Sequence, residues 1–357
     1  MSLSIGIVGL PNVGKSTLFN ALTNKQAEAS NYPFCTIDPN VGIVNVPDER
    51  LEKLAIISKP AKIIPAAIEF VDIAGLVKGA HEGEGLGNQF LSHIRECDAI
   101  CEVVRSFDDD NIVHVNGKVD PESDRETINL ELIFADLKTV EKSLERAAKD
   151  AKSGNKEIIK LKNLLEKIKT SLENGEAARD IEIDESEQKI IKSLNLLTLK
   201  PIIYVQNVNE KDLVDSENHH KWDGEIIKIS AKIESELAVL DPQEQKEYMA
   251  ELEIKESGLN RLIKASYKLL DLMTFFTTGP DETRAWTFKA GSKAPQAAGV
   301  IHTDFEKGFI RAEIINWKDF VEAGDEVKAK EKGLVRTEGK DYIMQDGDVC
   351  HFLFNKN

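Results

Sequence analysis

Short runs of apolar residues, rich in Val and Ile, alternate with helix-like stretches from Ser4 to Lys232. Such runs are typical of strands that are buried on both faces of a parallel sheet. Strand and helix in repeated order predict an α/β fold with right-handed crossovers, in which ligands bind at the carboxyl ends of the strands. The predicted strands are Ser4–Leu10, Ala67–Ile73, Ala99–Phe107, Pro201–Val208 and Glu225–Ser230.

The alternation is interrupted between about residues 126 and 198. Apolar residues recur there at spacings of three and four over two stretches, Ile133–Ala147 and Ile158–Leu172, and the breaker Ser153–Asn155 separates them. Two such stripes joined by a turn predict an antiparallel helical hairpin. Because the strand pattern resumes at Pro201, we expect the hairpin to be an arm inserted into the first domain.

The last part of the chain, from about residue 275, predicts a small α+β domain. Its strand-like runs are short and are separated by turns rich in Gly and Asp. These runs are Trp286–Lys289, Phe309–Ile315 and Val349–Phe354. The predicted domains are therefore 1–126 with 198–275, the arm 127–197, and 276–357.

Composition narrows the function classes. With 46 Lys and Arg against 62 Asp and Glu, the formal net charge is −16, which disfavours a uniformly basic nucleic-acid binder and a binder of anionic membranes. The four cysteines form no CxxC pair, so we expect reduced thiols in a cytosolic protein. No signal segment and no membrane-spanning apolar stretch is expected.

A phosphate-binding motif follows the first predicted strand. Gly9–Ser16 fits G-x-x-x-x-G-K-[ST] and opens a helix-like run, the context that supports a P-loop. The glycines let successive amides converge on phosphate oxygens at a helix N-terminus. Lys15 is predicted to reach the β- and γ-phosphates, and the Ser16 hydroxyl is predicted to bind Mg²⁺.

Two further segments carry candidates for the same site. Asp72 ends a predicted strand and begins Asp-x-x-Gly, so its carboxylate can hold a Mg²⁺-bound water and the Gly75 amide can meet the γ-phosphate. Thr36 lies in a predicted loop between helix and strand. Its hydroxyl is a candidate second Mg²⁺ ligand, ordered when the γ-phosphate is present; otherwise Thr36 is a plain turn residue.

Leu76 stands where many GTPases have the Gln that orients the attacking water. A Leu side chain cannot hydrogen-bond, so hydrolysis needs another group or is slow. His81, in a glycine-rich stretch, and His114, in an Asp- and Asn-rich loop, are candidate substitutes because imidazole titrates near neutral pH. Either can equally be a solvated loop histidine.

The segment after Pro201–Val208 predicts which base is bound. Guanine sites usually carry Asn-Lys-x-Asp, whereas this chain has Asn207, Val208, Asn209 and Glu210. Glu210 carries its carboxylate on a side chain one methylene longer than that of Asp, so the group is displaced from the position that pairs with guanine. Leaving one buried guanine donor without its partner costs about 1–3 kcal/mol of binding free energy. Adenine can instead meet the backbone around Val208. Ser230, Ala231 and Lys232, after the next strand, are predicted to complete the pocket.

These motifs resemble the YchF, or Obg-like ATPase, subfamily of translation-factor-type P-loop proteins. The resemblance extends over nearly the whole chain, although residues 127–197 match in pattern more than in sequence. The matching stretches are GLPNVGKST, NYPFCTIDPN, VDIAGLVKGAHEGEGLGNQFLSHI, NVNEKD, SAKIE, RAWTFKAGSKAPQAAGVIHTDFEKGFIRAEI and EGKDYIMQDGDV.

The resemblance implies an α/β P-loop nucleotide-binding domain, an inserted antiparallel coiled-coil arm and a C-terminal ubiquitin-like β-grasp (TGS) domain. It implies that ATP is preferred over GTP and that the main chain at Val208 contacts adenine. It places His114 in the loop of the family's proposed catalytic histidine. The phosphate ligands that it implies are Asn12, Val13, Gly14, Lys15, Ser16 and Thr17, and the implied Mg²⁺ ligands are Ser16 and Thr36.

Three hypotheses follow for the activity. The first is a slow, cytoplasmic, monomeric ATPase that cycles between ATP and ADP forms, binds the ribosome at its large subunit, contacts RNA through the arm or the TGS domain, and regulates translation or stress responses. The second is an ordinary GTPase. The third is a ribosome or RNA adaptor in which the nucleotide is structural.

The last domain offers candidate RNA contacts. Its aromatic residues either stack on RNA bases or, as we expect, fill the core; they are Trp286, Phe288, Phe305 and Phe309. Its basic residues are the better candidates for phosphate contacts; they are Lys289, Lys293, Lys307 and Arg311.

Overall fold

The computed structural model describes residues 3–24, 40–73, 86–114, 117–213 and 222–355. Its contacts divide the chain into two compact units, which are described separately. The first unit comprises Met1–Gly42 and Glu69–Leu262, and the second comprises Ile43–Ile68 and Ile263–Asn357. The three-domain division predicted above assigns residues 43–68 differently and stays a prediction.

The sheet of the first unit contains the five strands that the apolar pattern predicts. β4, β1, β5, β6 and β7 pair parallel in that order, so their carboxyl ends meet at one edge. The sheet order is β2 (Val41–Asn45), β4 (Ala67–Asp72), β1 (Ser4–Val8), β5 (Ala99–Ser106), β6 (Ile202–Val208) and β7 (Glu225–Ile229). The predicted α/β class is therefore confirmed.

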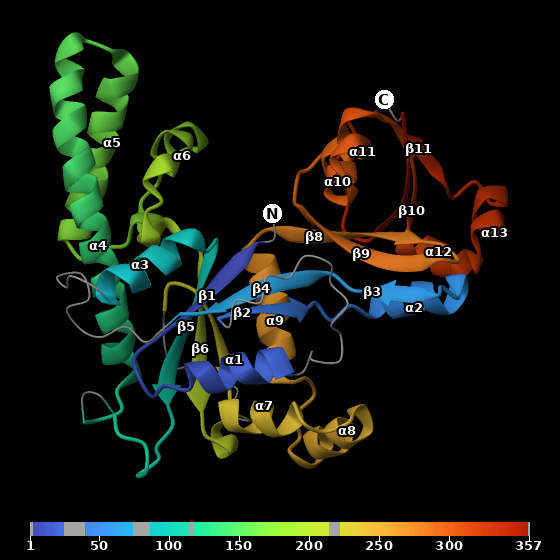
Figure 1. Ribbon diagram of the computed structural model, residues 1–357, viewed down its shortest axis with the longest axis horizontal. Helices are drawn as coiled ribbons and strands as arrows, with labels where there is room; N and C mark the ends of the chain where they lie inside the picture. Colours follow the sequence, from blue (N-terminus) through green and yellow to red (C-terminus); the bar gives the residue numbers. More distant parts are fainter. Residues whose placement is uncertain (1–2, 25–39, 74–85, 115–116, 214–221, 356–357) are drawn as a thin grey trace. The chain divides into compact units, whose positions relative to one another are not determined.

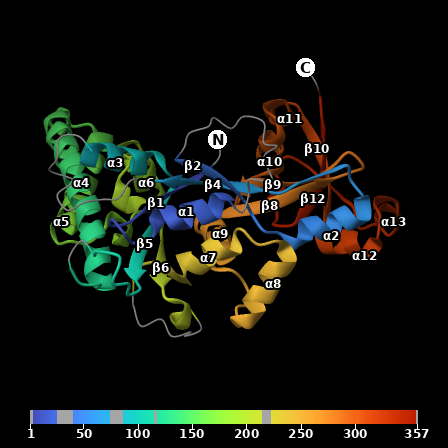
Figure 2. The same ribbon diagram turned by 60° about the horizontal axis from the view of Figure 1, so that its bottom comes forward.

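Helices flank this sheet, and α1 and α7 lie side by side (Figures 1 and 2). Both helices begin directly after a strand and its loop, so their N-termini lie at the carboxyl edge of the sheet. The helices are α1 (Lys15–Asn24), α3 (Leu86–Glu96), α4 (Pro121–Asp150), α5 (Lys156–Glu173), α6 (Glu185–Ile191), α7 (Ala231–Leu237) and α8 (Pro242–Glu251), followed by α9 (Gly258–Leu269). No described helix is long and apolar enough to cross a membrane.

Helices α4 and α5 form the predicted helical hairpin (Figure 1). The turn between them follows local rules, because Gly154 adopts φ 78° and the Asn155 side chain accepts a hydrogen bond from the amide of Glu157 at the start of α5. Apolar side chains spaced by three and four, including Val140, Leu165 and Ile168, are buried between the helices. Helix α4 begins at Pro121, earlier than the apolar stripe indicated, because Asp120 caps it. The coiled-coil description stays a prediction.

The second unit is built on a mixed sheet. β10 is antiparallel to β11 and β12, and β8 is antiparallel to β9, whereas β3 and β9 are parallel. The sheet order is β11 (Arg336–Glu338), β10 (Phe309–Asn316), β12 (Asp348–Phe354), β8 (Leu272–Thr278), β9 (Glu282–Lys289) and β3 (Lys62–Ile64). The helices are α2 (Glu49–Ser58), α10 (Ala294–Ile301), α11 (Thr303–Lys307), α12 (Trp317–Ala323) and α13 (Glu326–Glu331). The β-grasp description stays a prediction.

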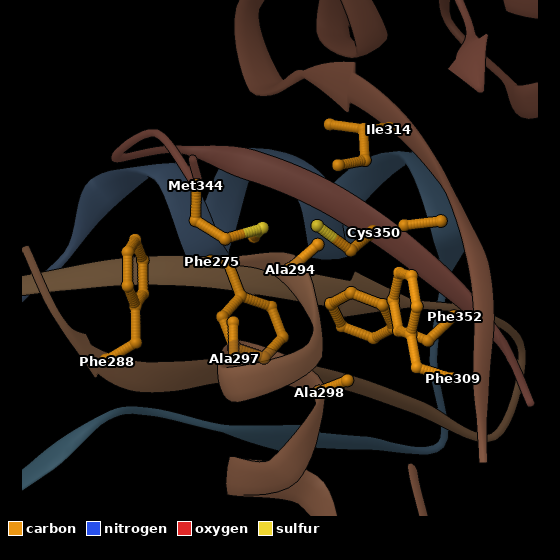
Figure 3. Packing of buried hydrophobic residues seen from close by; sticks show 11 residues of the cluster. Phe275, Phe288, Ala294, Ala297, Ala298, Phe309, Ile314, Met344, Cys350 and Phe352 are labelled. Atoms are coloured by element: carbon orange, nitrogen blue, oxygen red, sulfur yellow. The ribbon is translucent and has the colours of Figure 1, made fainter. Parts of the chain in front are cut away.

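An aromatic core lies between this sheet and helix α10 (Figure 3). Phe275 is fully buried and packs its ring against Phe288 and Phe352 at centroid distances of 5.9 and 5.5 Å. Small side chains on α10, such as Ala297, allow the helix to approach these rings. Of the aromatic residues considered as RNA platforms, Phe288 and Phe309 are buried, whereas Trp286 and Phe305 pack partly buried against the same core. The core interpretation is therefore confirmed.

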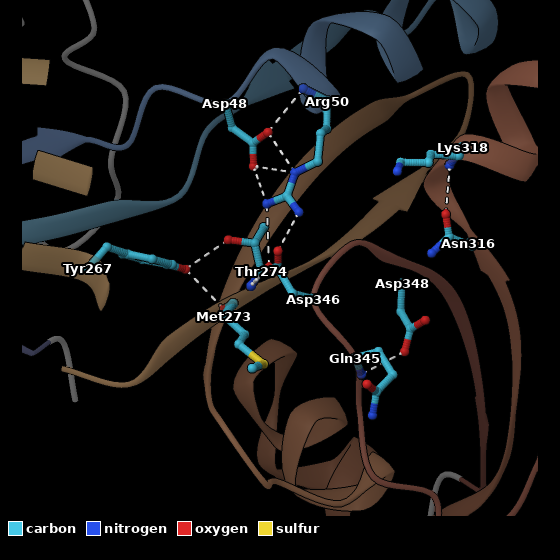
Figure 4. Close-up of polar contacts among 10 residues, drawn as sticks. All are labelled: Asp48, Arg50, Tyr267, Met273, Thr274, Asn316, Lys318, Gln345, Asp346 and Asp348. Carbon is cyan, nitrogen blue, oxygen red and sulfur yellow. Dashed lines mark hydrogen bonds and ion pairs between the residues drawn. The ribbon is translucent and has the colours of Figure 1, made fainter. Parts of the chain in front are cut away.

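An ion-pair network joins α2 to the rest of the second unit (Figure 4). The Arg50 guanidinium donates to Asp48 at 2.7 Å and to Asp346 at 2.6 Å, and it lies over the Phe276 ring. Burial opposes its charge, but the two carboxylates outweigh this effect and raise the pKa of Arg50. Asp346 also accepts a hydrogen bond from the Thr274 amide, so one carboxylate links α2 to β8.

Phe275→Ala removes the ring at the centre of this core. We expect the free energy of unfolding to fall by about 3–5 kcal/mol, because a buried cavity replaces the ring. Urea unfolding followed by tryptophan fluorescence measures the change. Ile343→Ala, at a 52% exposed position, is the control and should change stability by less than about 0.5 kcal/mol. Equal stability of the two variants would contradict this description of the core.

Candidate nucleotide-binding site

The loop between β1 and α1 has the backbone conformation of an anion-binding turn. Gly9, Asn12 and Gly14 adopt φ values of 153°, 63° and 98°, which glycine tolerates and asparagine adopts more readily than other residues. A Cβ atom on Gly9 would lie 2.5 Å from the Val103 carbonyl oxygen. The chain therefore turns tightly over β5, and the amides of this loop lie next to the N-terminus of α1, as the P-loop prediction requires.

Lys15 is 7% exposed, and its Nζ donates to the Leu10 carbonyl oxygen at 2.7 Å. Burial lowers the pKa of Lys15 to about 8, and the nearby Asp72 carboxylate opposes this shift. The Lys15 side chain thus folds back towards the loop, and its ammonium binds a carbonyl oxygen of the loop that is predicted to hold the phosphates. A triphosphate offers it stronger, charged acceptors than the carbonyl oxygen does.

Ser16 and Asp72 form a pair of oxygen donors beside this loop, with the Ser16 Oγ 3.3 Å from the Asp72 Oδ2. A hydroxyl and a carboxylate are hard oxygen ligands, the kind that Mg²⁺ takes together with water and phosphate oxygens. Among the described residues, no cluster of three or more His, Cys, Asp or Glu side chains could hold a metal ion by itself. The pair therefore fits a magnesium ion that is bound jointly with phosphates.

Several predicted residues lie outside the described residues. They are the Mg²⁺ candidate Thr36, the phosphate candidate Gly75, Leu76 at the position of the missing Gln, and the candidate His81. Their roles stay predictions.

Asn207 connects the phosphate loop to the opposite side of the pocket. Its Nδ2 donates to the Val13 carbonyl oxygen at 2.8 Å, and its Oδ1 accepts from the Ala231 amide at 3.0 Å. The side chain is buried, and a Cβ atom on Gly14 would lie 2.3 Å from its Nδ2. Asn207 thus joins three segments that are far apart in the sequence, through one amide hydrogen and one oxygen lone pair.

These segments surround a cavity of about 1100 Å³, which is large enough for a nucleotide. Nine of the predicted site residues line it, and they are Asn12, Gly14, Thr17, Asn207, Val208, Glu210, Ser230, Ala231 and Lys232. Other lining residues lie outside the quoted motifs, and they include Phe107, Asp109, Ile112, Leu213, Leu252 and Ile254. Leu252 and Ile254 follow α8, where the sequence carries no sign of a ligand site.

The wall formed by the loop after β5 depends on Arg105. This side chain is 2% exposed, and its guanidinium donates to the carbonyl oxygens of Phe107, Ile112 and Asp109. It also lies over the Phe107 ring, 4.4 Å from the centroid. Arg105 therefore shapes three residues of the cavity wall, although nothing in the sequence singles it out.

His114, the catalytic candidate, ends the described part of that loop. It is 8% exposed, so it is not the solvated loop histidine of the alternative interpretation. Its Nε2 lies 2.8 Å from the Asp124 Oδ2 on α4. The preceding residue, Val113, accepts a hydrogen bond from the Asn12 Nδ2 at 3.2 Å. His114 is therefore one residue away from a contact with the phosphate-binding loop.

Asn207→Asp tests the link between the three segments. The carboxylate keeps an acceptor for the Ala231 amide but places a second acceptor against the Val13 carbonyl oxygen. We expect ATP to bind roughly 10- to 100-fold more weakly, because a buried hydrogen bond becomes a repulsion. Calorimetry with Mg²⁺ measures this affinity, thermal melting verifies the fold, and Asn207→Ala is the comparison. Wild-type affinity in the isosteric Asp variant would show that the bridge is unimportant.

The lowered pKa of Lys15, about 8, predicts that nucleotide binding depends on pH. Above this pKa the free protein loses the Lys15 charge, whereas a bound triphosphate favours the ammonium. Binding should therefore take up a proton between about pH 8 and pH 9.5, and affinity should fall as the pH rises through this range. Calorimetry in buffers of different ionisation enthalpy measures the uptake. Binding with no proton uptake would contradict the predicted role of Lys15.

Two parts of the chain match known protein families. Residues 4–133 match the family described as "50S ribosome-binding GTPase". Residues 272–355 match the family YchF-GTPase_C, which is described as a protein of unknown function.

Full-length relatives are also highly similar. The "Ribosome-binding ATPase YchF" of Bacillus subtilis is 58% identical over 365 residues, which covers 99% of this chain and 100% of that protein. The protein of the same name from Haemophilus influenzae is 55% identical over 362 residues, with the same coverage. The solved structure of the Schizosaccharomyces pombe YchF GTPase is 41% identical, has a TM-score of 0.89, and covers 99% of this chain and 98% of that one. The resemblance noted in the sequence is therefore confirmed, and this chain belongs to the YchF family.

Proposed function

We propose that this chain is a ribosome-binding ATPase that hydrolyses ATP, in preference to GTP, to ADP and phosphate with Mg²⁺. The geometry of the base pocket is the observation that carries this proposal. Asn207 uses one amide hydrogen on the Val13 carbonyl oxygen and one oxygen lone pair on the Ala231 amide, so it holds the pocket together whichever purine is bound. The cavity wall then continues with Val208, where guanine-binding proteins carry the Lys that covers the ring.

Adenine suits this pocket better than guanine does. Its N6 amino group and N1 need one acceptor and one donor, which the backbone around Val208 can offer. Guanine needs a carboxylate close to N1–H and N2–H₂, and Glu210 carries that group on a side chain one methylene longer than Asp. The apolar walls Phe107, Leu252 and Ile254 offer contacts to either purine. The discrimination therefore depends on residues 207–210.

At the other end of the pocket, Asn12 to Thr17 would bind the phosphates. Lys15 would exchange the Leu10 carbonyl oxygen for β- and γ-phosphate oxygens. Ser16 and Asp72, with Thr36, would hold Mg²⁺, which when bound neutralises negative charge on the phosphates. Because Leu76 cannot orient water, we propose that His114 assists hydrolysis and that intrinsic turnover is slow. The ATP and ADP forms would act as the two states of a switch.

The proposed partner is the ribosome, with its large subunit as the first candidate. Support comes from the names of the relatives, which are called ribosome-binding ATPases, and from the match of residues 4–133 to a family described as 50S ribosome-binding GTPase. A cytoplasmic location and a monomeric state are part of the same proposal, as are RNA contacts by the arm or the TGS domain. The process that the switch would regulate is translation or a stress response.

Nucleotide competition tests the preference. With a fluorescent ATP analogue bound in the presence of Mg²⁺, unlabelled ATP should displace it at a concentration about tenfold or more below that of GTP, as expected for one buried hydrogen bond. A GTP advantage of the same size would overturn the proposal in favour of an ordinary GTPase.

A matched variant sharpens this test. Val208→Lys combined with Glu210→Asp creates Asn-Lys-x-Asp at the place where guanine readers have it. This variant should shift the ratio of affinities towards GTP, while Asn207 and its two hydrogen bonds stay in place. An unchanged ratio would show that residues 207–210 do not read the base.

A further inference from the structure

His114 lies against helix α4 within the first unit. Its Nε2 is 2.8 Å from the Asp124 Oδ2, and the two side chains are only 5% and 3% exposed. Asp124 belongs to the first turn of α4, which Asp120 caps and Pro121 begins. The imidazole is thus paired with a buried carboxylate that belongs to helix α4 and not to the loop that carries His114.

The same short segment reaches the phosphate-binding loop. Arg105 holds the start of the segment through three carbonyl oxygens, and Asn12 donates to Val113. The Gly117 amide donates a hydrogen bond to the His114 carbonyl oxygen at 3.0 Å. His114 therefore lies between the phosphate-binding loop and α4.

The first turn of α4 is itself anchored on neighbouring residues. The Arg125 Nη1 lies 3.5 Å from the Asp223 Oδ1, and the Trp222 Nε1 donates to the Glu122 Oε1 at 2.9 Å. These contacts flank Asp124 in sequence and tie the helix to the segment before β7. The position of the Asp124 carboxylate is therefore set by the helix and its anchors.

We propose that Asp124 is a positioning residue that acts through His114 in nucleotide hydrolysis. This inference rests on the proposed function, because it requires that His114 assists hydrolysis. Since Asp124 is part of a helix of 30 residues that continues into the hairpin, a displacement of α4 would also displace the imidazole. The pair thereby offers a physical connection between the hairpin and the phosphate site.

A carboxylate at Nε2 has two effects on an imidazole. It fixes the rotation of the ring, and it favours the tautomer that carries its proton on Nε2, which makes Nδ1 the atom able to accept a proton. It also stabilises the imidazolium that forms when Nδ1 takes a proton, as in other carboxylate–histidine pairs. Asp124 would supply this orientation without touching the nucleotide.

Asp124→Asn tests the proposal in the full-length protein, because the amide has the same shape but lacks the charge. We expect kcat for ATP to fall roughly 10- to 100-fold, the usual effect of losing an orienting partner. The Kd for a fluorescent ATP analogue should stay within about twofold, because Asp124 is not one of the residues that line the cavity. If Asp124→Asn does not fold, Asp124→Ser, which is smaller and uncharged, provides the same measurement.

A double-mutant cycle separates a positioning role from a structural one. In a His114→Ala background, Asp124→Asn should cause no further loss of kcat, because its effect passes through the imidazole. Additive losses would overturn the proposal. Asp184→Ala is the control, since it removes the cap of helix α6 in the same unit and should lower the melting temperature while kcat stays within about twofold.

The failures of the two proposals are distinguishable. If the wild-type protein does not hydrolyse ATP, the proposed function fails. If His114→Ala hydrolyses ATP at the wild-type rate, the assignment of His114 fails and this inference fails with it, while the ATP preference stands. If His114→Ala is slow but Asp124→Asn retains wild-type kcat, only the role of Asp124 is overturned.

Discussion

The site depends on a backbone turn that ordinary side chains cannot make. Gly9 and Gly14 adopt positive φ, and each faces an atom, the Val103 carbonyl oxygen or the Asn207 Nδ2, that would collide with a Cβ. This close approach lets the loop pack over β5 while its amides converge at the start of α1. The helix N-terminus, the converging amides and the buried Lys15 ammonium then favour an anion at the same point.

Two buried polar side chains hold the rest of the pocket in position. Asn207 bridges the phosphate loop and the start of α7, and Arg105 gathers the carbonyl oxygens of the loop after β5. Removing either would leave buried donors or acceptors without partners, which costs more than the hydrogen bonds themselves contribute. The protein's own hydrogen bonds therefore hold the pocket walls in place before a ligand binds. This lowers the entropic cost of ordering side chains and loops on binding.

Short sequence patterns were sufficient to predict much of the fold and part of the candidate site. The five parallel strands were predictable because buried parallel strands are continuously apolar, and the α4–α5 hairpin because its apolar residues recur every three or four positions. The phosphate loop was predictable because its glycines and Lys15 occupy fixed spacings. The walls formed by Leu252 and Ile254 were not, since an apolar residue that faces a ligand is indistinguishable in sequence from one that faces the core.

By itself, the sequence determined the α/β fold class and the family, because the apolar periodicity and the motifs that carry them are each encoded over short stretches of chain. The tertiary structure alone decided which distant side chains meet. The motif predicts Asn207 near a base, but its hydrogen bonds to Val13 and Ala231 depend on how the end of β6 lies relative to the loop after β1 and to the start of α7. The pairing of His114 with Asp124 likewise requires that a loop and a helix, ten residues apart, turn back on each other. Contacts of this kind depend on packing between elements, which local periodicity does not specify.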